Sequence, residues 1–204
     1  MSYLERLHPG DTELLESLRD YAKKNDVPII TKAGARFLRQ LIALRGARRI
    51  LEIGTAIGHT TALMAMQPSV VEVTTIERNA SMIALAKDTF ARSGMASAIT
   101  LIEGDALSVD TSKIGRVDMI FLDGAKAQNI KFFEKYESLL SPGGVIVADN
   151  ALFHGLHEET IQSRNLKQLV RKIDAFNHYA LNRDDYDSAL HPVGDGMLVS
   201  IKRG

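Results

Sequence analysis

The chain has 204 residues, of which 45% are hydrophobic and 25% charged, a composition typical of one globular domain with a substantial core. Its 25 basic and 25 acidic side chains balance, which argues against a protein that coats nucleic acid through bulk charge but allows a local basic face. The absence of cysteine excludes disulfides, thiolate metal sites and cysteine catalysis.

Two amphipathic helices are expected first. Apolar residues recur at helical spacing within 11–25 and again within 31–45. Pro28 follows the first segment and Gly46 ends the second. Both precede the first strand, so we expect an N-terminal helical layer over 1–46 that covers the site, supports a dimer, or does both.

The rest of the chain predicts an α/β core over 47–204. Strands and helices alternate, which favours right-handed crossovers and a mostly parallel sheet. A longer helix is expected near 158–180, and the Val193–Gly196 turn between two apolar segments predicts a final antiparallel hairpin. The expected strands lie near 48–53, 70–76, 98–102, 117–122, 144–149, 188–192 and 197–202, and the core helices near 58–66, 79–92 and 129–140.

No repeat, linker or low-complexity segment interrupts this pattern, so the whole chain, 1–204, is predicted to be a single domain. No apolar run reaches about 18 residues, and the charged start is unlike a signal peptide. We therefore expect a cytoplasmic protein with no membrane partner.

A glycine loop connects the first strand to the next helix. The strand breaks at Gly54, where the chain turns tightly and a ligand can approach the backbone. A dinucleotide fingerprint requires two further glycines, but those positions are Ala56 and His59. The loop therefore fails the dinucleotide pattern at two of three places.

A second cofactor class fits better. Glu52, Gly54 and Gly58 follow the pattern of S-adenosylmethionine (SAM) methyltransferases. Glu77 ends the next apolar run, where a carboxylate can hold both hydroxyls of a ribose. The glycine loop and Glu77 together predict a SAM site.

A second polar cluster follows two later strands. Asp123 and Lys126 come just after one strand, and Asp149 and Asn150 end the next. Adjacent parallel strands bring such residues to one rim, and two carboxylates with an amide oxygen suit Mg²⁺. Lys126 can then be a base for a substrate hydroxyl. A single acidic residue at a strand end is often only a cap or a turn former, as we expect for Asp118.

These motifs resemble the metal-dependent O-methyltransferases of the catechol and caffeoyl-CoA type, over roughly residues 25–204. That resemblance implies a Rossmann-like SAM methyltransferase fold: a seven-stranded, mostly parallel sheet with a reversed last strand, and commonly a homodimer. The tail further resembles the bacterial branch that methylates 5-hydroxyuridine in tRNA. The segments concerned are Leu51–Thr60, Asp123–Lys126 and Asp149–Gly155, and in the tail Phe176–His178, Asp185–Tyr186 and Pro192–Gly196.

The resemblance also implies roles for single residues. Asp123, Asp149 and Asn150 would hold Mg²⁺, and Lys126 would be the catalytic base, with Asp123 also facing the SAM amine. Gly124 and Phe153 depart from the family's usual residues and leave the substrate pocket open. The implied SAM contacts are Ile30 through its backbone, Glu52, Gly54, Thr60 at the methionine end, Glu77 at the ribose, Asp105 and Ala106 beside the adenine, and Asp123.

Three functions remain in competition. 5-Hydroxyuracil and catechol both present adjacent oxygens that one metal ion can chelate, so the site alone does not choose between tRNA and a small phenol. The tail resemblance favours tRNA, giving 5-methoxyuridine; the alternative is a catechol-like or caffeoyl-CoA-like phenol. A third hypothesis, an RNA-binding protein without catalysis, is disfavoured by the intact acidic cluster.

Basic residues at helical spacing near 158–180 are typical of either a phosphate-binding face or a solvated one. Tyr179 and Tyr186 are candidates for stacking on a base or for core packing. The basic residues are Arg164, Lys167, Arg171 and Lys172, with Arg36, Arg39, Arg45, Arg48 and Arg49 adding charge around the second helix.

Overall fold

The protein contains one seven-stranded sheet with strand order β3-β2-β1-β4-β5-β7-β6. The structure, a computed structural model, describes residues 7, 10–153 and 161–204. All neighbouring strands are parallel except at β7, which runs antiparallel to both β5 and β6. This confirms the expected mostly parallel sheet with a reversed last strand. The strands are β1 (Arg49–Ile53), β2 (Glu72–Glu77), β3 (Ile99–Glu103), β4 (Val117–Leu122), β5 (Leu140–Ala148), β6 (Tyr186–His191) and β7 (Met197–Lys202).

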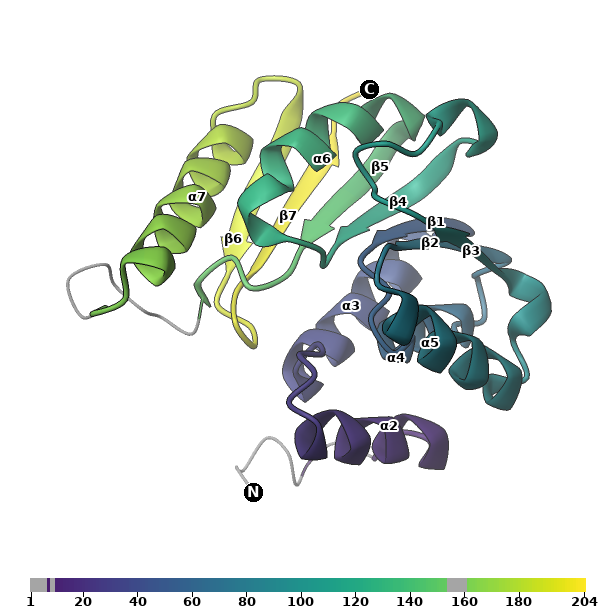
Figure 1. Cartoon of the computed structure of the whole chain (residues 1–204). Coiled ribbons are helices and arrows are strands. Elements are labelled where there is room, and N and C mark those ends of the chain that lie inside the picture. The colour runs from purple at the N-terminus through teal and green to yellow at the C-terminus, as the bar shows by residue number, and fades with distance from the viewer. Residues whose placement is uncertain (1–6, 8–9, 154–160) are drawn as a thin grey trace.

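Helices cover both faces of the sheet (Figure 1). The N-terminal pair and the first two core helices lie on one face, and the last two lie on the other. Threonine side chains cap the first two helices, because Thr12 and Thr31 accept backbone N–H groups of the first turn. The α-helices are α2 (Glu13–Lys24), α3 (Lys32–Arg45), α4 (His59–Ala65), α5 (Ala80–Ser93), α6 (Asn129–Tyr136) and α7 (Arg164–Leu181); the 3₁₀ turns are η1 (Ala96–Ala98), η2 (Thr111–Lys113), η3 (Lys126–Gln128) and η4 (Glu137–Leu139).

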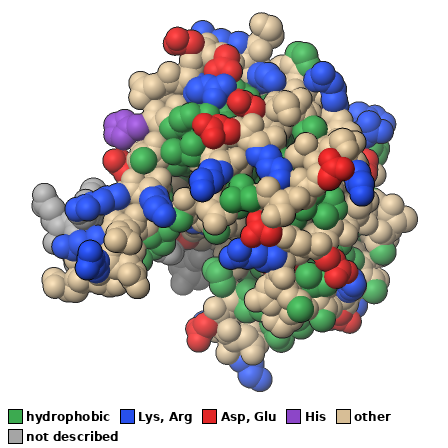
Figure 2. Space-filling model, turned by 45° about the horizontal axis from the view of Figure 1, so that its top comes forward, with side chains coloured by type: hydrophobic (Ala, Val, Ile, Leu, Met, Phe, Trp, Pro, Cys, Tyr) green, Lys and Arg blue, Asp and Glu red, His purple; other side chains and the backbone are tan. Residues whose placement is uncertain are grey.

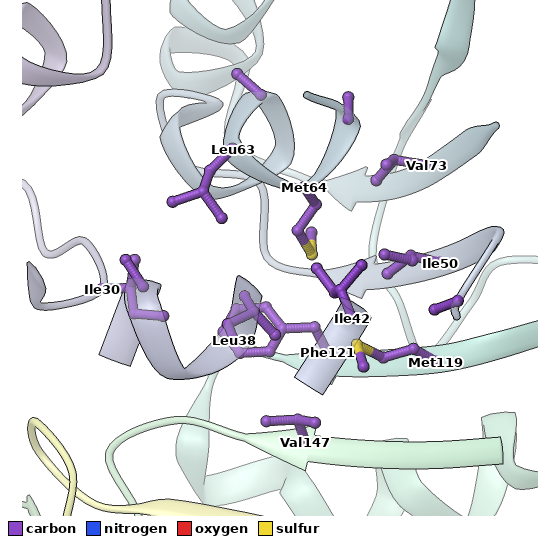
Figure 3. Packing of buried hydrophobic residues seen from close by; sticks show 14 of the residues in the cluster. Ile30, Leu38, Ile42, Ile50, Leu63, Met64, Val73, Met119, Phe121 and Val147 are labelled. Carbon is purple, nitrogen blue, oxygen red and sulfur yellow. The ribbon is translucent and has the colours of Figure 1, made fainter. Parts of the chain in front are cut away.

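Successive strand residues point into two separate cores. Met119 and Phe121 of β4 pack with the N-terminal layer, whereas Ile120 and Leu122 pack under α6 and α7. Figure 3 shows the first core, where α3 and α4 meet the sheet. Because both faces are buried, the inner part of β4, Met119–Leu122, is a continuous apolar run, as expected for a parallel sheet.

The second core includes an arginine among aromatic rings. Tyr186 is 2% exposed, and its ring centroid lies 4.9 Å from that of Phe133 in an edge-to-face arrangement. The Arg183 guanidinium lies 5.4 Å from the Tyr186 centroid and donates to the Tyr179 hydroxyl at 2.6 Å. Core packing therefore explains Tyr186, and the Tyr179 hydroxyl is bonded within the fold.

Two helix boundaries differ from the sequence prediction. The helix expected over 129–140 ends at Tyr136, because a 3₁₀ turn follows and β5 already begins at Leu140. The helix expected over 158–180 begins at Arg164, where the Ser163 side chain accepts the Leu166 N–H. Residues 158–160 lie outside the described part. No helix in the described ranges is long and apolar enough to cross a membrane.

Candidate active site

A cavity of about 530 Å³ opens at the carboxyl ends of the central strands. Ligands bind at this edge in open parallel sheets, and the volume is in the range of small-molecule sites. Residues that follow β1, β2, β3, β4 and β5 all reach it, together with Leu169 of α7. The predicted site residues among its walls are Gly54, Glu77, Asp105, Ala106, Asp123, Lys126 and Asn150.

Gly54 lies where the loops after β1 and β4 touch. Its φ is +101°, and a Cβ there would lie 2.8 Å from the backbone carbonyl carbon and oxygen of Asp123. Gly54 was expected to let a ligand approach the backbone. Because it has no side chain, it also lets the segment after β4, which carries Asp123, pack directly against the glycine loop. Ala56 and Gly58 in the same loop also have positive φ angles.

Backbone N–H groups hold the Glu77 carboxylate in place. Its Oε2 accepts from Ala56 N at 2.9 Å, and its Oε1 accepts from Arg78 N and Asn79 N, both at 2.9 Å. The carboxylate therefore has a fixed orientation at the end of β2, on the wall of the cavity. A fixed carboxylate with remaining lone pairs is suited to accept hydroxyl hydrogens.

Glu52 and Thr60 lie beneath the loop and are not among the cavity-lining residues. Glu52 is fully buried; its Oε2 accepts from the hydroxyls of Thr61 and Thr75, and its Oε1 has no hydrogen-bond partner among the residues that the structure describes. Burial raises the pKa of Glu52 to about 8, although the two threonine bonds act in the opposite direction. Thr60 is 5% exposed. Both side chains are buried, so the structure does not place either of them on the cavity wall.

Asp105 and Ala106 form the wall that follows β3. Asp105 accepts from Leu107 N at 2.8 Å and from Arg78 NH1 at 2.9 Å, and these bonds lower its pKa. The backbone oxygen of Ala106 accepts from the Tyr136 hydroxyl at 2.6 Å. The position expected beside an adenine is thus fixed by hydrogen bonds within the fold.

Two carboxylates follow β4 and β5 at the other end of the site, where Asp123 lines the cavity and the buried Asp149 is not among the lining residues. Asp123 Oδ1 forms an ion pair with Lys126 Nζ at 2.6 Å, and both side chains are largely buried. Asp149 is 4% exposed, and its pKa is raised to about 6 by burial and then by the nearby Asp123 charge. Asn150 has a φ of +59° and lines the cavity beside them.

This donor set fits a divalent cation. Two nearby carboxylates that repel one another in a buried place are stabilised by a cation, and an amide oxygen adds a third hard ligand. No group of three or more histidine, cysteine, aspartate or glutamate side chains arranged for a metal occurs in the described ranges. The candidate set therefore consists of two carboxylates and one amide, and solvent or substrate would have to complete it.

Ile30 is 1% exposed, and its backbone oxygen accepts from Arg19 NH1 at 2.8 Å; Pro28, two residues earlier, lines the cavity instead. Sequence reasoning also missed Arg78, Phe132 and Leu169 among the lining residues. Leu169 lies on α7, so its placement depended on where that helix packs.

The predicted basic residues divide between two ends of the molecule. Arg164, Arg171 and Lys172 are exposed on α7, and Figure 2 shows Lys and Arg side chains gathered where α7 begins. Arg48 and Arg49 precede or begin β1 and so lie at the opposite edge of the sheet from the cavity. Their backbone N–H groups donate to Asp118 Oδ2 at 2.9 and 3.0 Å, so Asp118 links β4 to the start of β1 instead of forming the cap or turn that was expected.

Comparison with known protein families gives a match over almost the whole chain. A family model described as O-methyltransferase matches residues 6–203. The chain belongs to the O-methyltransferase family. This confirms the enzyme class that the sequence predicted.

The similarity to individual proteins extends over most or nearly all of the chain. A catechol O-methyltransferase of Niastella koreensis is 33% identical over 176 residues, covering 81% of this chain and 78% of that protein. A Staphylococcus aureus protein assigned as a caffeoyl-CoA O-methyltransferase has a solved structure with 37% identity, a TM-score of 0.92 and coverage of 98% and 97%. The Bacillus cereus O-methyltransferase, solved with SAH, is 25% identical, with a TM-score of 0.82 and coverage of 97% and 93%.

Proposed function

We propose that this O-methyltransferase transfers a methyl group from SAM, with Mg²⁺, to the 5-hydroxyl of 5-hydroxyuridine in tRNA, giving 5-methoxyuridine. The main observation behind the proposal is the single cavity that joins the Glu77 end to the Asp123 and Asn150 end. A methyl donor held at the first end and a hydroxyl held at the second would meet within one site.

The Glu77 end suits the nucleoside part of SAM. The Glu77 carboxylate would accept both ribose hydroxyls, while Asp105 and Ala106 would flank the base. The O-methyltransferase of Bacillus cereus was solved with SAH, the product that SAM leaves after methyl transfer, which supports the same cofactor here. We propose no direct contact for Glu52, because its side chain lies beneath the loop.

The acidic end would hold the metal through Asp123, Asp149 and Asn150. A bound Mg²⁺ supplies Lewis acidity that makes a chelated hydroxyl easier to deprotonate. Lys126 Nζ lies 2.6 Å from Asp123 Oδ1 as an ion-paired ammonium, so it would first release a proton to solvent and then, as the neutral amine, take the hydroxyl proton. The substrate oxygen then forms its bond to the methyl carbon as the carbon–sulfur bond breaks, in line, so the main task of the chain is alignment.

The basic end of α7 supports a tRNA substrate. Leu169 of α7 lines the cavity, so the helix that exposes Arg164, Arg171 and Lys172 also forms part of the site wall. Phosphates of a bound RNA would meet these charges while one base enters the cavity. The alternative, a catechol-like or caffeoyl-CoA-like phenol, is favoured by the named relatives and would use the same acidic end. We also propose that the protein forms a homodimer.

The first experiment incubates the protein with SAM and tRNA that contains 5-hydroxyuridine, with Mg²⁺ or with EDTA, followed by nucleoside mass spectrometry. We expect 5-methoxyuridine with Mg²⁺ and none with EDTA. A parallel reaction with a catechol tests the alternative. Methylated catechol without any methylated tRNA would reject the tRNA substrate and retain the enzyme class.

A charge-reversal pair tests the surface. Arg164→Glu with Lys172→Glu should raise the KM for tRNA several-fold and leave the KM for SAM unchanged, because both side chains are exposed on α7 and each phosphate contact contributes separately. Arg48→Glu is the matched control, since Arg48 lies at the far edge of the sheet. Equal KM values for tRNA in the parent, the double variant and the Arg48→Glu control would rule out α7 as the RNA-binding face.

A further inference from the structure

The turn between β6 and β7 reaches the loop that follows β5. Leu152 N donates to the backbone oxygen of Asp195 at 3.0 Å, and Ala151 N donates to that of Gly196 at 2.9 Å. Gly196, with φ +88°, has no room for a side chain, because a Cβ there would overlap Leu152. The turn is therefore fixed against the residues that directly follow Asn150.

One side-chain bond accompanies these backbone bonds. Asn150 Nδ2 donates to Asp195 Oδ2 at 3.3 Å. An ionised carboxylate only accepts hydrogen bonds, so Asp195 can bond only the nitrogen end of the amide. The two ends of an asparagine amide have nearly the same shape, and only its oxygen can bind a cation.

We propose that Asp195 is a positioning residue that holds the Asn150 amide with Oδ1 available to the divalent cation. This inference rests on the metal site of the proposed function and adds a residue 45 positions away in sequence. Asn150 keeps its own backbone in the left-handed region, at φ +59°, so its side chain is presented from an unusual backbone conformation. Without Asp195 the amide can rotate and place its nitrogen where the cation binds.

The same turn also touches the N-terminal layer. A Cβ at Gly194, where φ is +60°, would overlap the Thr31 side chain at the start of α3. Thr31 itself caps α3 through the Gly34 N–H at 3.1 Å. The turn is thus held on one side by α3 and on the other by the Asn150 loop, so Asp195 has a defined position from which to act.

The experiment measures Mn²⁺ affinity by electron paramagnetic resonance, with Mn²⁺ as the probe and no turnover involved. Asp195→Asn has nearly the same shape but can offer either an oxygen or a nitrogen to Asn150. We expect its Mn²⁺ dissociation constant to rise about tenfold, as for other partners that orient metal ligands. Asp187→Asn, at an exposed position of β6, removes the same charge from the same hairpin and should change the constant by less than about twofold.

A second background separates orientation from simple charge. In Asn150→Asp the ligand has two equivalent oxygens, so there is no amide left to orient. Adding Asp195→Asn to that background should not weaken Mn²⁺ binding if Asp195 acts by orienting Asn150. A loss of the same factor in both backgrounds would show a through-space charge effect and overturn the inference.

Two further outcomes are decisive. An Asp195→Asn protein that binds Mn²⁺ as tightly as the parent overturns the inference while leaving the metal site intact. A parent protein that binds no Mn²⁺ overturns the metal part of the proposed function, and the inference with it. SAH affinity, measured for every variant, confirms that the fold and the Glu77 end are preserved.

Discussion

The two ends of the cavity are built in different ways. At the Glu77 end, backbone N–H groups satisfy the carboxylate, and every bond spans at most 21 positions in sequence. At the acidic end, Asp149 and Asp123 repel one another, and a turn 45 positions further along fixes Asn150. The first end is complete in the chain alone, whereas the second has a charge arrangement that a cation would stabilise. The same site thus combines a carboxylate that backbone hydrogen bonds hold in place with two carboxylates that repel one another.

The largest effect is expected from removing one acidic ligand. Asp149→Ala should lower kcat by roughly 100-fold or more, because a metal contributes several kcal/mol to such a reaction. SAH affinity should stay within about threefold, since Glu77 and its backbone donors are untouched. Steady-state kinetics and calorimetry measure the two quantities. Unchanged turnover would contradict the metal assignment, and lost SAH binding would show that the two ends are not independent.

Gly54 offers a way to disturb both ends together. Gly54→Ala places a Cβ 2.8 Å from the Asp123 backbone at φ +101°, so the strained backbone and the overlap should together cost about 2–5 kcal/mol of unfolding free energy. We expect weaker binding of both SAH and Mn²⁺. Gly46→Ala is the control: its φ is +63°, and no atom of the described residues lies within 4 Å of a Cβ there, so only about 1–2 kcal/mol should be lost. Equal losses in urea unfolding would mean that the Gly54 contact is unimportant.

The buried Glu52 carboxyl group lies near the Glu77 end, and we expect it to avoid charge repulsion by keeping its proton. Its pKa is raised to about 8, so the folded protein keeps a proton that the unfolded chain loses above the ordinary glutamate pKa of 4.5. The unfolded state then binds fewer protons, and the free energy of unfolding falls as the pH rises from 4.5 towards 8. Between pH 5 and 7 this amounts to roughly 2–3 kcal/mol.

Glu52→Gln should remove that slope. An amide stays neutral at every pH in the window, and its oxygen can still accept from Thr61 and Thr75. Urea unfolding at pH 5, 6, 7 and 8 compares the two proteins, and the difference between them isolates Glu52 from other titrating groups. Parallel curves for parent and variant would show that Glu52 is ionised in the fold.

The same contrast explains what the sequence could predict. The Glu77 end follows local patterns: an apolar strand, a glycine turn, a helix start, and a carboxylate at the end of the next strand. Asp123, Asp149 and Asn150 were also expected together, because parallel neighbours bring their carboxyl ends to one edge. Alternation and turn chemistry therefore sufficed for a mostly parallel sheet with a final antiparallel hairpin and for the cavity edge, whereas the strand order came only from the structure.

Contacts that depend on the packing of distant segments could not be predicted. Nothing near Asp195 in sequence indicates that its carboxylate meets Asn150, because that contact requires β7 to lie antiparallel beside β5. Likewise, helical periodicity continued past Tyr136 because Leu139 and Leu140 keep the spacing, although Leu140 belongs to β5. Glu52 was predicted from a motif, but its full burial was not, because that depends on the packing that brings Thr61 and Thr75 into hydrogen bonds with its carboxyl group.

The smallest effect is expected at the rim of the Glu77 end. Arg78 forms an ion pair with Asp105 at 2.9 Å, but the two side chains are 63% and 39% exposed, so water screens the attraction. In Arg78→Ala, Asp105 still accepts from Leu107 N at 2.8 Å and keeps its place. We therefore expect an unchanged unfolding midpoint and a SAH dissociation constant within about twofold of the parent, measured by calorimetry. A tenfold loss would mean that an exposed side chain, and not the backbone alone, prepares this end for its ligand, and the contrast between the two ends would then be one of degree.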